Sequence, residues 1–314
     1  MRLCGKKITS IERLPDTTII DWVLGNYCNF QCSYCFPNAN TGTCRVPRLD
    51  INLKRNIFHL LDQIDSTGKQ KVSFHFGGGE PTLYRDIIPL MEFVYPLGHI
   101  SFVSNGSRTV RWWKQNVQYI NHVLFSYHSE YTDLNHMMNV IETIEDTVDI
   151  NVHVMVNPNL FDKCIHAYKT LSNKFSSVDI QLKLLREDGR TITYTKEQYK
   201  IINENLSKPE SKPSATVNCE GTKSSFKLHH IKDLSGNFTG YNCYAHHDFL
   251  QIDKRGNVGK MSCGQDFATR SNIYSKNFID KFTLPKSHVV CQQEICGCVG
   301  LLFARKEINE VEVR

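Results

Sequence analysis

Three cysteines stand close together after the first apolar run of the sequence. Cys28, Cys32 and Cys35 have the spacing CxxxCxxC within a polar loop that contains Asn, Gln and Ser. Three thiolates on one short loop can hold three irons of a cubane iron–sulfur cluster and leave the fourth iron open. An open coordination position distinguishes a reactive metal centre from a closed structural one. Two alternatives stay open: a zinc site completed by Cys44, and three buried structural cysteines.

A glycine-rich segment follows the second apolar run. The run KVSFHF, residues 71–76, leads into Gly78-Gly79-Glu80-Pro81. Glycines at the end of a strand let the backbone approach a ligand closely, although a glycine run before a proline is also typical of an ordinary turn. Its place one strand–helix unit after the cysteines favours a role beside them.

The two motifs together resemble those of the radical S-adenosylmethionine (radical SAM) enzymes. CNFQCSYCF is similar to the signature loop of that family, including the aromatic Tyr34 before the third cysteine, and residues 78–80 match its glycine-glycine-glutamate segment. The resemblance implies that the three cysteines are the catalytic ligands of a [4Fe-4S] cluster. It also implies that the glycine-glycine-glutamate segment binds the methionyl amino group of S-adenosyl-L-methionine (SAM).

Further matches lie at the ends of later apolar runs. Ser104-Asn105-Gly106 is similar to the family's threonine-asparagine-glycine turn, although Ser replaces Thr, and it is also typical of a plain turn. The resemblance places Ser126 near the ribose or carboxylate of SAM, and residues 154–157 along the adenine, although the family's fifth-strand glycine motif is absent. His128, nearby, is equally typical of a surface histidine. The cofactor-binding residues implied in this way are Tyr34, Phe36, Gly78, Gly79, Glu80, Ser104, Asn105, Ser126 and Asn157.

The resemblance also implies the chemistry. One electron, from a donor such as flavodoxin or ferredoxin, would cleave SAM to methionine and a 5′-deoxyadenosyl radical, which takes hydrogen from an unactivated carbon. The chemistry belongs to the cofactor, so the expected tasks of the protein are to position the substrate and exclude water.

A second group of cysteines follows residue 240. Four thiols around a small hairpin can hold a metal with little core, and a zinc ribbon is one interpretation. The order also resembles the C-terminal auxiliary-cluster (twitch or SPASM-like) extension of radical SAM enzymes, which implies a second [4Fe-4S] cluster that relays an electron or binds substrate. Which four thiols are ligands stays open. The candidates are Cys243, Cys263, Cys291, Cys296 and Cys298.

Cys219 precedes this group in the loop VNCEGT. Radical epimerases with a similar architecture use such a thiol to donate hydrogen to a substrate radical, and an exposed or packed thiol is the simpler interpretation.

The remaining sequence predicts the elements that position these residues. Helical spacing of apolar residues, as at 53–64, follows each predicted strand. Strands each followed by a helix predict an α/β fold with a parallel sheet, curled into a partial (βα)6 TIM-like barrel whose reactive groups lie at the C-terminal ends of the strands. The predicted strands are residues 17–25, 71–76, 99–104, 122–128, 149–156 and 177–185.

The pattern of alternating apolar and helical stretches ends after residue 206. A polar, proline-interrupted stretch predicts a linker or extended loop, and residues 249–261 predict a hairpin around an Arg-Gly-Asn turn. We therefore expect a radical SAM barrel at residues 1–206, and a linker with a small cysteine-rich, iron–sulfur extension at residues 207–314.

Composition bounds the location and partners. The 314 residues are 40% hydrophobic and 22% charged, which excludes a disordered or fibrous protein. The N-terminal residues lack the apolar core of a signal peptide, and no apolar run spans a bilayer, so a cytoplasmic protein without a membrane partner is expected. In that reducing compartment, twelve cysteines favour metal binding or chemistry over disulfides. The formal charge of +5 is too slight to indicate nucleic acid by itself.

The expected function is oxidation, rearrangement or epimerisation of a small molecule, such as a nucleotide or sugar derivative. A peptide substrate is the second interpretation, because only 27 residues precede Cys28, few for a peptide-recognition domain. A nucleic-acid base is the third, since SRTVRWWKQ mixes aromatic and basic residues, although Trp112 or Trp113 packed into a core explains it more simply. The non-enzymatic alternative is a binding module with zinc in both cysteine groups.

Overall fold

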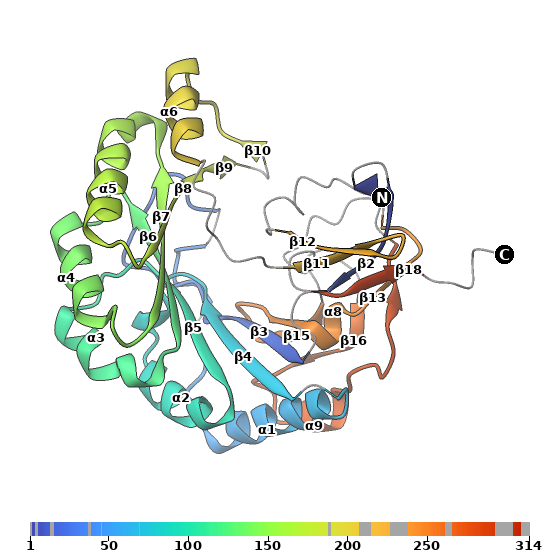
Figure 1. Ribbon diagram of the computed structural model, residues 1–314. Coiled ribbons are helices and arrows are strands. Elements are labelled where there is room, and N and C mark those ends of the chain that lie inside the picture. The colour runs from blue at the N-terminus through green and yellow to red at the C-terminus, as the bar shows by residue number, and fades with distance from the viewer. Residues whose placement is uncertain are drawn as a thin grey trace. The chain divides into compact units, whose positions relative to one another are not determined.

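The computed structural model (Figure 1) describes residues 2–3, 6–12, 16–36, 39–44, 46–68, 70–187, 190–206, 215–226, 238–260, 266–292 and 304–308. The chain forms two compact units. Unit 1 contains residues 1–22, 49–74 and 211–314, and unit 2 contains residues 23–48 and 75–210. The units interleave along the chain, and the predicted division into residues 1–206 and 207–314 stays a prediction.

Unit 2 is built from strands that alternate with helices, and Figure 1 shows its helices along one side of its strands. Its strands β5 (His99–Ser104), β6 (His122–His128), β7 (Asp149–Val156) and β8 (Asp179–Leu184) pair in parallel in that order. The strand β4 (Lys71–Gly77) enters this unit with its last residues. The helices are α2 (Ile87–Val94), α3 (Val110–Asn116), α4 (Leu134–Ile144), α5 (Phe161–Lys174) and α6 (Lys196–Leu206). Short strands β9 (Arg186–Glu187) and β10 (Arg190–Thr191) pair with each other.

The core of unit 2 follows the predicted periodicities. Every second residue of β7, from Ile150 to Val156, is buried, whereas the residues between are half-buried. Helix α4 begins at the N-cap Asp133, whose side chain accepts from the amide of His136, and buries one apolar face. Trp113 is fully buried against Phe125, with ring centroids 5.1 Å apart, as expected for one of the two tryptophans.

Unit 1 contains the predicted hairpin. Strands β14 (Phe249–Ile252) and β15 (Asn257–Lys260) are antiparallel, and β16 (Asp266–Asn272) pairs with β15. The sequence did not indicate that β14 would also pair in parallel with β3 (Thr17–Val23). The helices are α1 (Ile51–Asp65), α8 (Ala245–Asp248) and α9 (Phe278–Lys281).

A second sheet in unit 1 corrects the predicted linker. Residues 215–226, expected as linker or extended loop, form a hairpin of β11 (Ala215–Cys219) and β12 (Thr222–Phe226). The polar composition of this stretch did not indicate strands, because the hairpin is stabilised by pairing with β2 (Lys6–Glu12), which is far away in the sequence. The stability of β strands depends on such partners. The sheet continues through β18 (Lys306–Ile308), β13 (Tyr241–Cys243) and β17 (Val289–Val290), with β1 (Arg2–Leu3) beside β2.

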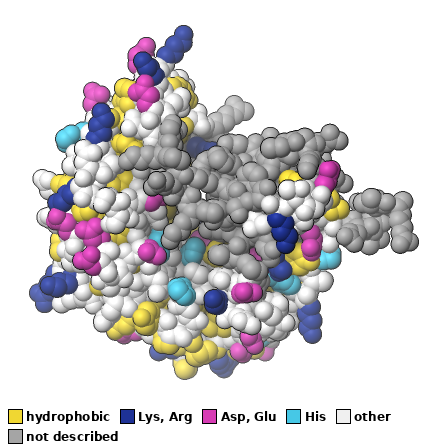
Figure 2. All heavy atoms as spheres, viewed as in Figure 1, with side chains coloured by type: hydrophobic (Ala, Val, Ile, Leu, Met, Phe, Trp, Pro, Cys, Tyr) yellow, Lys and Arg dark blue, Asp and Glu magenta, His cyan; other side chains and the backbone are white. Residues whose placement is uncertain are grey.

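The fold is therefore α/β with a mostly parallel sheet, as predicted, while the barrel closure and the iron–sulfur extension stay predictions. Among the described helices, none is long and apolar enough to cross a membrane. Charged side chains of both signs are interspersed among the described residues on the face in Figure 2, as a small net charge leads one to expect.

Candidate active site around the cysteine loop

The three clustered cysteines lie in unit 2 on the segment that follows β3, residues 26–36 and 39–44, which we call the cysteine loop. A buried asparagine, Asn26, closes its base. The Asn26 side chain donates to the Thr41 and Thr43 hydroxyls at 2.9 and 3.1 Å and accepts from the Cys44 amide at 2.7 Å. The Gly42 amide donates to the Asn26 carbonyl at 3.0 Å. One side chain thus joins the two ends of the loop.

The three thiols of the loop lie within electrostatic range of one another. The Cys35 amide donates to the Cys32 carbonyl at 3.0 Å, and the Phe30 amide to Cys28 Sγ at 3.3 Å. Burial raises the pKa of all three thiols, that of Cys32 to about 12, and the neighbouring thiols raise it further in Cys28 and Cys32. Among the described residues, no three His, Cys, Asp or Glu side chains converge as a ready metal site, with or without Cys44.

Two glycines pack the end of β4 against the base of the cysteine loop. Gly78 has φ +128°, and a Cβ there would lie 2.8 Å from the Gly25 carbonyl oxygen. A Cβ on Gly79 would lie 2.2 Å from the Tyr27 carbonyl oxygen. The Glu80 amide donates to this same Tyr27 carbonyl at 2.7 Å. These glycines therefore let the backbone after β4 approach the backbone just before Cys28.

The Glu80 carboxylate is buried, and its oxygens accept hydrogen bonds from other groups of the protein. It is 2% exposed and accepts from the Thr82 amide and hydroxyl at 3.1 and 2.6 Å. It also accepts from the Ser104 hydroxyl at 2.8 Å and from the Asn105 amide at 2.6 Å. Burial raises the pKa of Glu80, and these hydrogen bonds oppose the rise. Glu80 therefore ties the end of β4 to the end of β5.

Asn105, after β5, extends that link to the first cysteine. Its side-chain amide donates to Asn29 Oδ1 at 3.0 Å and lies 3.7 Å from Cys28 Sγ. Its Oδ1 accepts from the Ser107 amide at 3.0 Å. The predicted Ser104-Asn105-Gly106 turn thus contacts the Cys28 end of the loop.

A segment that begins at the last residue of β6, residues 128–131, holds the loop around Cys32 and Cys35, and we call it the β6 anchor. The Glu130 carboxylate accepts from the Ser33 amide and hydroxyl at 2.8 and 2.5 Å. It also accepts from the Asn157 side-chain amide at 2.9 Å. Glu130 thereby joins the loop to the end of β7.

Aromatic contacts add to the β6 anchor. The Tyr34 hydroxyl lies 2.8 Å from His128 Nδ1 and the two rings stack, while Phe30 stacks on Tyr131 with centroids 5.2 Å apart. The Tyr131 hydroxyl donates to the Gln31 carbonyl at 2.9 Å. Burial lowers the pKa of His128 to about 4, against the opposing effect of Glu130, so the imidazole is neutral at physiological pH.

The comparisons with known proteins establish the family of the chain. A family model described as the radical SAM superfamily matches residues 22–200. The chain belongs to the radical SAM superfamily. It is therefore an enzyme, and the family implies SAM and a [4Fe-4S] cluster as its cofactors. Membership sets aside the non-enzymatic zinc-binding module.

Two similar proteins match only part of this chain. GTP 3′,8-cyclase of Haemophilus influenzae is 32% identical over 101 residues, 30% of this chain and 29% of that protein. S-adenosylmethionine-dependent nucleotide dehydratase of Selenomonas ruminantium is 31% identical over 81 residues, 26% of this chain and 27% of that protein. The match thus spans about three tenths of each relative's length. A solved structure described as native anSMEcpe with bound AdoMet has TM-score 0.47 and 18% identity, over 77% of this chain and 74% of that one.

The structure brings most of the predicted radical SAM residues together in unit 2. Residues 28–35, 78–80, 104–105 and 157 are joined by the hydrogen bonds described above. Phe36 is 66% exposed, and Ser126 is half-buried within β6. Sequence reasoning missed Glu130, for which the only signal was a carboxylate two residues beyond a predicted strand.

The strands present a polar face opposite the one that packs on the helices. Ser126 lies beside His153, which lies beside Gln181, and the next row contains Lys183. Gln181 and Lys183 are exposed. Burial and the charge of Lys183 lower the pKa of His153 to about 4. We call these four residues the inner polar face.

Of the second cysteine group, the structure describes Cys243 and Cys291, both buried in unit 1. Cys243 lies opposite Val289 in register, and the Cys291 amide donates to the Tyr241 carbonyl at 2.8 Å. Cys291 directly follows β17, so it lies within two residues of the position opposite Cys243. Cys263, Cys296 and Cys298 lie outside the described residues.

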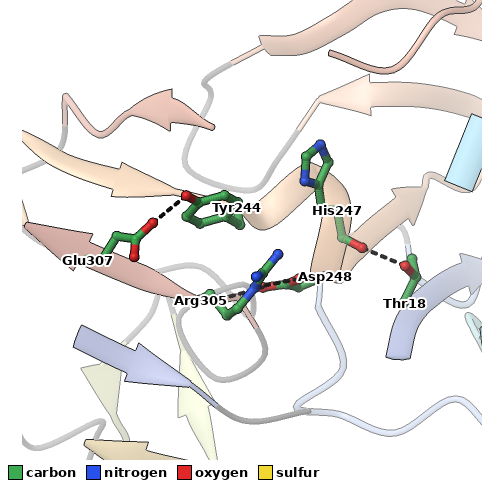
Figure 3. A network of polar contacts seen from close by, with 6 residues as sticks. All are labelled: Thr18, Tyr244, His247, Asp248, Arg305 and Glu307. Carbon is green, nitrogen blue, oxygen red and sulfur yellow. Dashed lines mark hydrogen bonds and ion pairs between the residues drawn. The ribbon is translucent and has the colours of Figure 1, made fainter. Parts of the chain in front are cut away.

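A polar network ties the strands around these cysteines together (Figure 3). Arg305 donates to the buried Asp248 at 3.1 Å and lies over the Tyr244 ring, whose hydroxyl donates to Glu307. The Thr18 hydroxyl donates to the His247 carbonyl at 2.5 Å. Cys219, predicted in a loop, ends β11 and is buried, 6% exposed.

Proposed function

We propose that this enzyme binds a [4Fe-4S] cluster through Cys28, Cys32 and Cys35, and uses SAM to oxidise, rearrange or epimerise a small nucleotide-like molecule. The observation that carries the proposal is the cysteine loop itself, held at Cys28 by Asn105 and at Ser33 by Glu130. With cluster and SAM bound, reductive cleavage would supply a radical able to take hydrogen from an unactivated carbon.

The donor set of the loop fits a cluster with an open iron. It offers three thiols within eight residues, which is the number and type of ligand that hold three irons of a cubane cluster and leave the fourth iron open. The raised thiol pKa values mean that metal binding must release protons.

The segment at residues 78–80 is proposed to meet the methionyl end of SAM through its backbone. Because the Glu80 carboxylate is occupied by four internal donors, its proposed role is to hold this backbone and the Asn105 turn in place. Tyr34, Phe36, Ser126 and Asn157 stay proposed contacts of SAM.

A nucleotide-like substrate is supported by two observations. The relatives named above are a GTP cyclase and a nucleotide dehydratase. On the inner polar face, Lys183 supplies a cation and His153 supplies a hydrogen-bonding group, which together suit a phosphate, while the Gln181 amide donates to Asp179 at 2.6 Å. A peptide substrate remains the alternative.

The test uses anaerobically reconstituted protein with SAM and dithionite. The expected product is 5′-deoxyadenosine, and Cys32→Ala should abolish it; undiminished cleavage by that variant would contradict the cluster assignment. Purine and pyrimidine nucleoside triphosphates, matched nucleosides and a peptide library are then supplied in parallel. A nucleotide-dependent rise in product that Lys183→Ala weakens supports the substrate class, and a response to peptide alone overturns it.

We propose a second cluster in unit 1, held by Cys243, Cys291 and two of Cys263, Cys296 and Cys298. It is supported by the position of Cys291 one residue beyond β17, which pairs with the strand of Cys243, and by Lys306, directly opposite Cys243 in register, whose ammonium would favour thiolates. Two such clusters predict about eight irons per chain. Cys243→Ala with Cys291→Ala should leave about four, with SAM cleavage retained; stoichiometric zinc instead would contradict this site. Electron relay and substrate binding are its two proposed roles, and Cys219 stays a proposed hydrogen donor.

A further inference from the structure

In the Cys32–Cys35 half of the cysteine loop, one carboxylate accepts from both the amide and the hydroxyl of Ser33. We propose that Glu130 is a positioning residue for the radical SAM cluster, whose carboxylate fixes this half of the loop and whose negative charge lowers the reduction potential of the cluster. This inference rests on the proposed function, because it places the cluster on the cysteine loop.

The hydrogen bonds put the carboxylate against the backbone that carries the ligands. Both Glu130 oxygens receive hydrogen bonds from Ser33, which directly follows Cys32. The third donor, Asn157, is itself held, since its Oδ1 accepts from the Asn159 amide at 3.0 Å and it is 4% exposed. A side chain fixed on both sides can set the position of the loop rather than follow it.

The three groups that donate to Glu130 are neutral, while the Lys163 ammonium donates to the carbonyl of the adjacent Ser129. The three donors are a backbone amide, a hydroxyl and a side-chain amide, which stabilise a carboxylate without cancelling its charge. A negative charge beside an iron–sulfur cluster makes the addition of an electron less favourable, so the potential falls. A low potential is what reductive cleavage of SAM needs.

The test compares three variants of the full chain. Glu130→Gln removes the charge but keeps size and one acceptor oxygen, and Ser33→Ala removes one hydrogen bond but keeps the charge. Glu142→Gln is the matched control, because Glu142 pairs with Lys174 at 2.7 Å on the exposed surface of α4 and α5. The measurement is the midpoint potential of the reconstituted cluster, followed by its electron paramagnetic resonance signal.

The expected result is a more positive potential in Glu130→Gln, with Ser33→Ala and Glu142→Gln close to the original protein. An unchanged potential in Glu130→Gln would overturn the electrostatic role. Where Glu130→Gln folds but holds no iron, Glu130→Asp decides: recovery of the cluster at the original potential supports the proposal, and no recovery overturns it.

A second measurement does not depend on the cluster. In the metal-free protein, amide hydrogen exchange over residues 31–36 should be faster in Glu130→Ala than in the original protein, and unchanged in Glu142→Gln. Equal exchange in all three proteins would overturn the positioning role. Failure of the original protein to assemble a cluster would instead contradict the proposed function, while the exchange measurement still decides whether Glu130 holds the loop.

Discussion

The Glu80 carboxylate is a hub that joins the ends of β4 and β5 by hydrogen bonds. Replacement of one of its oxygens should therefore change the stability of the protein. Glu80→Gln replaces one acceptor oxygen with a donor NH2, which must face the Asn105 amide or the Thr82 and Ser104 hydroxyls. A buried unsatisfied donor costs about 1–3 kcal/mol, so we expect that loss in the free energy of unfolding by urea. Glu92→Gln, on an exposed residue that accepts from Tyr119, should change it by less than about 0.5 kcal/mol. Equal stability of both variants would contradict the hub.

The lowered pKa of His153 predicts that the protein loses stability as the pH falls. Its folded pKa is about 4, and its unfolded pKa is near 6.5, so between these values the unfolded chain binds more protons and stability falls as pH falls. His153→Gln should remove roughly 1–2 kcal/mol of this fall between pH 7.5 and 5, measured by urea unfolding. The remainder should persist, because burial also lowers the pKa of His128 and His246 to about 4. An unaltered pH dependence would contradict the shift.

The residues of the site were predictable to different degrees. The cysteines and the Gly78-Gly79-Glu80 segment were predictable because their identity and spacing are local in the sequence. Glu130 was not, because its partners Ser33 and Asn157 are 97 and 27 residues away, and nothing local marks such a contact. The Glu80 carboxylate was located correctly, but its internal partners could not be foreseen.

At the scale of elements, the junction between β4 and the cysteine loop depends on close backbone approach. Gly79→Ala would place a methyl group 2.2 Å from the Tyr27 carbonyl oxygen, so the chain before Cys28 must move. We expect a destabilisation of at least about 1–3 kcal/mol and reduced iron uptake on reconstitution. Gly77→Ala is the matched control, since a Cβ there meets nothing within 4 Å. Equal iron uptake by the two variants would contradict the importance of this junction.

Elements with a local signature were predicted and those that depend on remote partners were not. Strands β6 and β7 alternate buried and half-buried residues, and the 249–261 hairpin carries its own turn, so the sequence suffices for both. The β11–β12 hairpin looks like a linker because its stability comes from pairing with β2, some 200 residues earlier.

At the scale of the whole molecule, unit 1 gathers the beginning and the end of the chain into one structure. Strand β2 lies between β11 and β18, so residues 6–12 pair with residues from both 215–219 and 306–308. The network of Figure 3 likewise joins Thr18, residues 244–248 and residues 305–307. No local pattern in the sequence predicts such a unit.

Asp248 lies at the centre of the polar network in Figure 3. In the original protein the Asp248 carboxylate is 2% exposed and accepts from both the amide and the side chain of Arg305. Asp248→Asn would leave the guanidinium of Arg305 facing a neutral group. Breaking a buried pair costs about 3–5 kcal/mol, and because Arg305 is partly exposed we expect about 2–3 kcal/mol, with faster hydrogen exchange at residues 241–248 and 304–308. Lys174→Met, which breaks the exposed pair with Glu142, should cost less than about 1 kcal/mol. If both variants cost the same, the network does not hold the end of the chain, and pairing of β18 with β2 and β13 must do so alone.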